Sequence, residues 1–165
     1  MAGTCSFDVV SDFDHQELVN AIDQLKREVE QRYDLKDSKT EIDLDENHLV
    51  ITTSSDMSLQ AVEAALRQKA TKRNLSLKIF DFQKPESSSG NRVRQKILLK
   101  KGLSQDIAKK LSKLIREKLK KINVSIQGDS LRITGKNKDD LQEVISILRS
   151  QEDNIELPLQ YQNYR

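Results

Sequence analysis

Apolar residues alternate between strand-like and helix-like spacing along the first half of the chain. The short run 6–10 (SFDVV) has strand character. From 18 to 29 apolar residues recur every three or four positions, as one buried face of a helix requires, and Asp14 is a candidate N-cap for this helix. Alternation then predicts a hairpin over 42–53, a second helix around 59–66 and a last strand over 75–82.

The second half repeats this pattern. Residues 49–69 and 131–151 align without a gap at an offset of 82 residues, and both contain Leu-x-Ile-Thr followed by Leu-Gln-x-Val. An offset of half the chain indicates a duplicated domain of about 80 residues rather than a solenoid repeat. The elements expected in the second half are a strand over 92–100, a helix capped by Ser104, a hairpin over 124–133, a helix over 141–148 and a strand over 155–164.

Each half therefore has the order βαββαβ, which is the ferredoxin-like pattern. We expect an α+β fold of two tandem domains, each a four-stranded antiparallel sheet with two helices on one face and the other face free. The segment KPESSSGN at 84–91 is rich in Pro, Ser and Gly and reads as a linker. The expected boundaries are a first domain over 11–84, a linker over 85–91 and a second domain over 101–165.

Composition favours a soluble protein of the cytoplasm. Hydrophobic residues make up 36% and charged residues 33% of the chain, and no apolar run approaches the roughly 18 residues that span a membrane. The N-terminus lacks the pattern of a secretory signal, and the one cysteine, Cys5, cannot form an internal disulfide. We expect a cytoplasmic protein that does not act at a membrane.

The sequence gives no sign of catalysis or of a metal site. His15 and His48 are the only histidines and lack ligand spacing with Cys5. No nucleophile–histidine arrangement and no glycine-rich phosphate loop is present. We expect a protein that is not an enzyme and carries no cofactor.

Charge divides unevenly between the halves. Residues 1–84 hold 11 Lys and Arg against 16 Asp and Glu, a net charge of −5, whereas residues 85–165 hold 17 against 10, a net charge of +7. Such asymmetry indicates either attraction between the domains or an anionic partner for the basic half. The helix after Ser104 holds Lys109, Lys110, Lys113, Arg116, Lys118, Lys120 and Lys121, typical of a solvated face and also suited to phosphate backbones.

The strand over 92–100 places its cations on one face. Arg92, Arg94 and Lys96 share a parity with Lys100, while Val93, Ile97 and Leu99 take the other. Two interpretations remain open: an edge strand whose charges prevent aggregation, or an anion-binding sheet face.

Aromatic residues are few, and two have an unusual predicted position. If 75–82 is one strand with Leu75, Leu77 and Ile79 toward the core, Phe80 and Phe82 face the other way. Either packing against the other domain or stacking on bases would explain them.

The chain resembles the YajQ family of small bacterial proteins. The resemblance is carried by SFDVVS at 6–11, RYDLK at 32–36, QGDSLRITGK at 127–136 with DDLQ at 139–142, and QNYR at 162–165. It implies tandem ferredoxin-like domains that exchange their first strands, so that 5–10 completes the second domain and 92–100 the first. The basic strand would then lie near Phe80 and Phe82, joining cations and aromatic rings on one surface.

The resemblance also implies nucleotide binding. By position we expect Arg132, Lys136 and Arg165 to contact phosphates, with Thr134 on the same outward face as Arg132. The candidate ligands are a nucleotide such as GTP, ATP or cyclic di-GMP, or RNA. Three hypotheses follow: a non-enzymatic protein that binds nucleotide or RNA phosphates, a cyclic di-GMP receptor acting on transcription through a protein partner, and a protein-interaction or chaperone-like scaffold. The sequence leaves the oligomeric state open.

Overall fold

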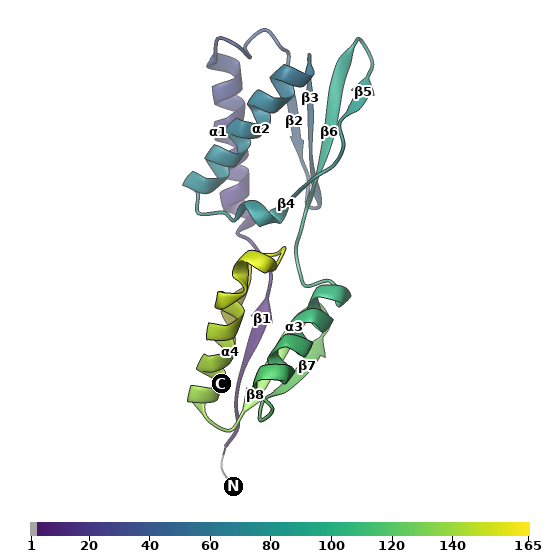
Figure 1. The fold of residues 1–165 in the computed structure, drawn as a ribbon. Coiled ribbons are helices and arrows are strands. Elements are labelled where there is room, and N and C mark those ends of the chain that lie inside the picture. Colours follow the sequence, from purple (N-terminus) through teal and green to yellow (C-terminus); the bar gives the residue numbers. More distant parts are fainter. Residues whose placement is uncertain (1–2) are drawn as a thin grey trace. The chain divides into compact units, whose positions relative to one another are not determined.

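The computed structural model describes residues 3–165, which form two compact units. The central unit is Phe13–Lys100, and the terminal unit comprises the residues up to Asp12 together with Lys101–Arg165. Each unit has its own sheet and its own pair of helices (Figure 1).

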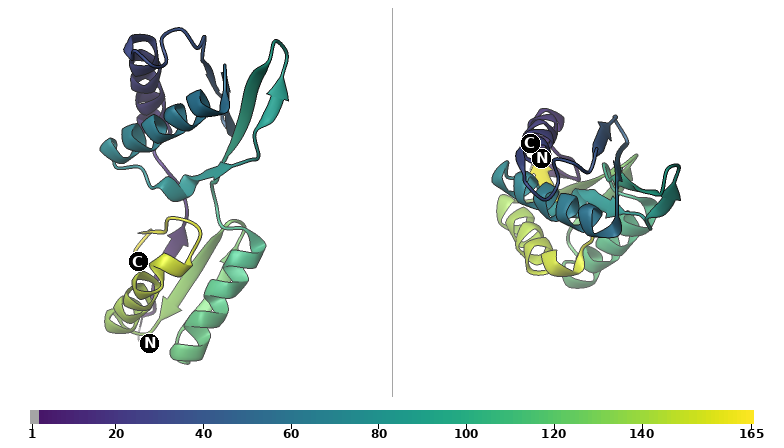
Figure 2. Two further views of the ribbon diagram at one scale, coloured as in Figure 1. Left: turned by 45° about the horizontal axis from the view of Figure 1, so that its top comes forward. Right: turned by 90° about the horizontal axis from the view of Figure 1, so that it is seen from above.

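In the central unit two helices cover one face of a sheet (Figure 2). The strand order is β2-β3-β6-β4, neighbouring strands are antiparallel, and β5 also pairs with β6. The Asp14 carboxylate accepts hydrogen bonds from the backbone N–H groups of Gln16 and Glu17, which confirms the predicted N-cap. The elements are α1 (His15–Gln31), β2 (Glu41–Leu44), β3 (His48–Thr53), α2 (Asp56–Lys72), β4 (Phe80–Phe82), β5 (Glu86–Ser88) and β6 (Arg92–Leu99).

The terminal unit has the same construction around a second core. Its strand order is β7-β8-β1-β9, with all neighbours antiparallel, and Phe7 and Val9 of β1 are fully buried in its core. The Ser104 hydroxyl accepts from the N–H of Ile107 and so caps α3 as predicted. The elements are β1 (Cys5–Val10), α3 (Gln105–Lys118), β7 (Asn123–Gln127), β8 (Ser130–Gly135), α4 (Lys138–Ser150) and β9 (Gln160–Gln162).

Residues 3–165 form a mixed α/β architecture with four α-helices and two antiparallel sheets, which is compatible with two ferredoxin-like domains. Within these sheets β1 pairs with β8 and β9, and β6 pairs with β3 and β4.

The charge asymmetry between the two halves of the sequence disappears when the charges are counted for each structural unit instead. The central unit holds 15 Lys and Arg against 15 Asp and Glu, a net charge of 0, and the rest of the chain holds 13 against 11, a net charge of +2. Neither unit is therefore strongly basic or acidic as a whole.

Three segments differ from the expected pattern. Leu77–Ile79 is a 3₁₀ turn that the Ser76 hydroxyl caps, so the strand expected over 75–82 begins only at Phe80. The last strand is only Gln160–Gln162: Pro158, which has no N–H to donate, precedes it, and Asn163, with φ of 58°, follows it.

The segment expected to be a linker contains β5, which pairs in register with Arg92–Arg94 of β6. Gly90 and Asn91 have φ of 72° and 59° and let the chain reverse tightly between the two strands. Ser and Gly in this stretch therefore serve a hairpin that belongs to the central unit.

Candidate functional site

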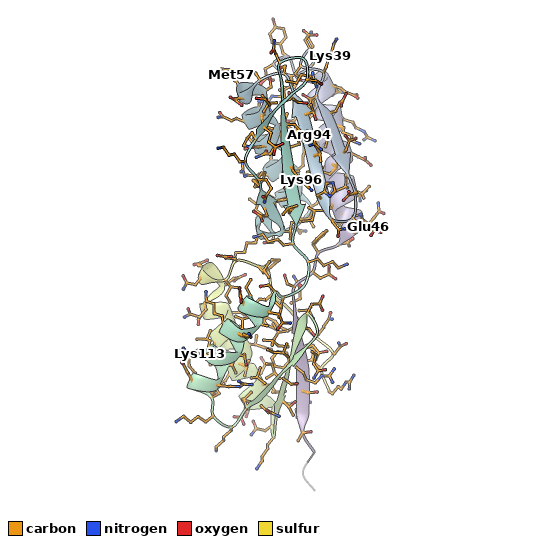
Figure 3. All side chains as sticks on the ribbon, turned by 90° about the vertical axis from the view of Figure 1, so that its right-hand side faces the viewer. Lys39, Glu46, Met57, Arg94, Lys96 and Lys113 are labelled. Carbon is orange, nitrogen blue, oxygen red and sulfur yellow. The ribbon has the colours of Figure 1, made fainter. Side chains whose placement is uncertain are left out.

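The cations of the predicted basic strand, β6, lie on the face of the central sheet that no helix covers. Arg94 and Lys96 are exposed on β6, while Gln95 and Ile97 between and beyond them are buried, so the predicted alternation is confirmed. Figure 3 shows Arg94 and Lys96 following one another along β6. Pairing places Arg94 opposite Thr52, which lies opposite Glu41, and Lys96 opposite Val50, which lies opposite Asp43.

The helix-free face of the central sheet contains a hollow of about 530 Å³, which we call the sheet-face hollow. A different hollow, of about 750 Å³, lies between the helices of this unit. Val50 lies in the lining of the sheet-face hollow and is only 8% exposed, which makes it a small apolar floor among polar neighbours. The other lining residues, from β2, β3, β6 and the β5 hairpin, are Glu41, Asp43, Thr52, Ser88, Ser89, Arg92 and Arg94.

The two arginines of this hollow differ in what they contact. Arg92 donates through Nη1 to the carbonyl of Ser38 at 3.2 Å and through Nη2 to the carbonyls of Lys39 and, at 3.3 Å, of Thr52. Its guanidinium thus fixes the loop before β2. Arg94 has no ion pair or side-chain hydrogen bond with any of residues 3–165, so its five N–H donors are open to a ligand.

The chemistry of the sheet-face hollow suits a molecule with both acceptor and donor groups. The fork of Arg94 matches two phosphate oxygens, and the neighbouring Lys96 adds a point charge. The carboxylates of Glu41 and Asp43 accept hydrogen bonds from hydroxyl or amino groups, as on a ribose or a base. The hydroxyls of Thr52 and Ser88 can do either.

The predicted position of Phe80 and Phe82 beside these cations is wrong. Phe80 is 5% exposed in the core, and Phe82 is half-buried against it, because both pair with the inward-facing residues Leu99 and Ile97 of β6. The 3₁₀ turn before Phe80 breaks the alternation on which that prediction depended. Phe82 is covered by Arg67, whose Cζ lies 4.4 Å from the ring centroid.

In the terminal unit, Arg132 projects from β8 into an ion pair. Its Nε donates to Asp8 Oδ1 at 3.1 Å, and Asn163 donates to Asp8 Oδ2 at 2.8 Å. Burial raises the pKa of Asp8, but hydrogen bonds from Asn163 and Arg132 and the charges of Arg132 and Arg165 outweigh it and hold the pKa below its ordinary value. The contact engages Nε and leaves the Nη edge of Arg132 for an anion.

The other predicted residues of the terminal unit are spread over its helix-free sheet face. Thr134 is half-exposed next to Arg132 along β8, and Arg165 pairs through its backbone with Ser6 of β1. Lys136 is exposed just after β8.

Sequence reasoning missed the carboxylates and hydroxyls of the sheet-face hollow. Glu41 and Asp43 alternate with Ile42 and Leu44, so their outward direction was readable from the sequence. Ser88 and Ser89 lie in the segment that the sequence predicts to be a linker, so a role in a site was not expected for them. His48 pairs with Asp45 in the hairpin turn at 3.0 Å.

Within residues 3–165 no group of three or more His, Cys, Asp or Glu side chains could hold a metal ion. The same residues contain no helix long and apolar enough to cross a membrane.

Comparison with known proteins gives matches along almost the whole chain. The family model described as "Nucleotide-binding protein YajQ-like" matches residues 5–165. A nucleotide-binding protein of Prochlorococcus marinus (strain MIT 9211) is 70% identical over 165 residues, covering 100% of both chains. Nucleotide-binding proteins of Synechococcus sp. (strain CC9605) and Trichodesmium erythraeum (strain IMS101) are 68% and 58% identical over the same 100% of each chain.

Proposed function

Because the chain belongs to the YajQ-like family of nucleotide-binding proteins, we propose that it binds the phosphate groups of a nucleotide on the helix-free sheet face of the central unit. One observation carries this placement. Arg94, a cation without a partner among the described residues, lines a hollow of about 530 Å³ together with hydrogen-bonding side chains. Small-molecule sites have volumes of roughly 300–1,000 Å³, so a nucleotide fits this size class.

The roles of the residues follow from their positions. Arg94 and Lys96 hold the phosphates, Val50 underlies the ligand, and Glu41 and Asp43 accept hydrogen bonds from the sugar or base. Arg92 keeps the rim of the hollow in place through the carbonyls that it binds. The protein acts by binding and not by catalysis, in the bacterial cytoplasm.

The arrangement of the strands is part of this proposal. We take the pairing of β1 with β8 and of β6 with β3 to be an exchange of first strands between the two copies of the sequence repeat. The exchange places the basic strand opposite the acidic β2 across β3, and so forms a hollow lined by both charges.

Calorimetric titration with GTP, ATP, cyclic di-GMP and a short RNA tests the proposal. At 0.15 M salt we expect one of the three nucleotides to bind and Arg94→Gln to weaken that binding about tenfold or more, since a charge-assisted hydrogen bond contributes about 1.5–3 kcal/mol. Lys109→Gln removes an exposed charge from α3 of the terminal unit and should leave the affinity unchanged.

Three outcomes would overturn parts of the proposal. Loss of binding on Arg132→Gln but not on Arg94→Gln would move the site to the terminal unit. Binding of RNA alone would exclude a nucleotide ligand. Hydrolysis of any nucleotide during the titration would make the protein an enzyme.

A further inference from the structure

The helix side of the central unit contains a second hollow, of about 750 Å³, between α1 and α2. It lies on the helices, whereas the sheet-face hollow is lined by strands and the β5 hairpin. Four cations line it, Arg27 and Arg32 from the end of α1 and Lys69 and Lys72 from the last turn of α2. Glu28 is the one carboxylate in this lining, so the lining carries a net charge of +3 in a unit whose net charge is 0.

Helical spacing explains how these residues meet. Arg27 and Glu28 each lie three or four positions from both Gln24 and Gln31, so all four residues share one face of α1. Lys69 and Lys72, three positions apart, share one face of α2. Cations in the last turn of α2 also complement the helix dipole, which accounts for Lys69 and Lys72 in structural terms.

Two of the four cations are already neutralised. Lys69 Nζ lies 3.0 Å from Glu28 Oε1, and this pair joins the two helices. Arg32 lies between Glu28, at 3.4 Å, and Asp34, at 2.8 Å. Glu28 therefore occupies the centre of the cationic cluster and acts there as an internal anion.

The other two cations are not neutralised by a carboxylate among residues 3–165. Arg27 and Lys72 are exposed, they come from different helices, and neither has an ion pair or side-chain hydrogen bond with any of residues 3–165. Beside them the amides of Gln24 and Gln31 can donate to an anion.

We propose that this α1/α2 groove is a second binding site, for a small polyanion that carries two or three linked phosphates. The lining spans eight residues of α1, from Gln24 to Gln31, or about 10 Å of helix, which suits a compact phosphate chain. The carboxylates of Asp23 and Glu30 are exposed on the same helix and would repel a long polyanion such as RNA.

Inorganic triphosphate is the probe, titrated at 0.15 M salt into protein that carries Arg94→Gln to weaken the sheet-face hollow. Arg27→Gln and Lys72→Gln should each lower the affinity about threefold or more, because each removes an unpaired charge from a partly screened groove. Lys26→Gln is the matched control, since Lys26 precedes Arg27 on α1 but lies outside the lining. It should change the affinity less than twofold.

Glu28→Gln gives a test of opposite sign. Removing the internal anion raises the charge of the lining to +4 and frees Lys69, so triphosphate should bind about threefold more tightly. Glu63→Gln is its control: Glu63 pairs with Arg67 on α2, outside the groove.

The proposal is overturned if triphosphate does not bind the Arg94→Gln protein. Equal affinity changes in the groove variants and their controls would also overturn it, since they would show a general charge effect, and so would weaker binding by a folded Glu28→Gln protein. Binding of a nucleotide to the wild type is a separate result, and neither outcome decides the other.

Discussion

Substitution of Arg92 tests whether its hydrogen bonds to backbone carbonyls stabilise the rim of the sheet-face hollow. We expect Arg92→Met, which keeps the aliphatic stem and removes every donor, to destabilise the central unit. Arg92 donates to the carbonyls of Ser38, Lys39 and Thr52, and two of these contacts are long, at 3.2 and 3.3 Å. Three charge-assisted hydrogen bonds at a half-buried site, two of them long, amount to about 2 kcal/mol.

Two further variants separate geometry from charge. Arg92→Lys keeps the charge but has no planar fork to reach three carbonyls, so it should recover less than half of the loss. Arg94→Met is the same truncation two residues along the same strand, at a side chain without a partner among residues 3–165, and should cost less than about 0.5 kcal/mol.

Native-state hydrogen exchange measures these effects within the central unit, where the two units need not unfold together. A loss of about 2 kcal/mol makes the slowest amides of β3 and β6, such as those of Ile51 and Ile97, exchange about thirtyfold faster. Exchange in Arg92→Met no faster than in Arg94→Met would refute the structural role of Arg92. Full stability of Arg92→Lys would show that charge alone suffices.

Two predictions concern the terminal unit. Because the pKa of Asp8 is lowered from 3.8 on folding, its ion pair stabilises the fold fully above that pH, and the contribution is lost as pH falls through the folded-state pKa. The difference in stability between wild type and Asp8→Asn, measured by urea denaturation, should therefore be wide at pH 7 and shrink as the pH falls below 3.8. A difference independent of pH would contradict this expectation. Gly102 has φ of 83° and an added Cβ would lie 2.5 Å from Asp129 Oδ2, so Gly102→Ala should lower the melting temperature; adding Asp129→Ser should restore part of the loss, because it relieves the clash but not the backbone strain, and no recovery would show that the clash is unimportant.

The order of helices and strands could be predicted from the sequence because each core follows a simple period. The buried residues of α1 and the alternation on β6 are visible as spacing alone. The predictions were wrong where a capping side chain, a proline or a residue with positive φ ended a strand or turned the chain, although the spacing of apolar residues predicted a longer strand or a linker. The Ser76 cap made a turn of 77–79, Pro158 shortened the last strand, and Gly90 with Asn91 made a hairpin of the presumed linker.

The candidate site was less predictable because it depends on which strands are neighbours. The alternation along β6 predicted that Arg94 and Lys96 point outward. It could not show that β3 lies between β6 and β2, which places Glu41 level with Arg94 and Asp43 level with Lys96. The charge asymmetry of the halves was equally misleading, since it disappears when β1 and β6 are counted with the sheets that contain them. The α1/α2 groove could not be predicted, because its lining comes from two helices and the spacing of residues within one helix does not show which other helix lies beside it.

The most direct test of nucleotide binding on the sheet face is NMR chemical-shift mapping with the tightest binder among GTP, ATP and cyclic di-GMP. We predict the largest amide shifts at Val50, Thr52, Arg94 and Lys96, which line or border the sheet-face hollow. Shifts confined to the terminal unit around Arg132, with none along β3 and β6, would contradict the proposed site.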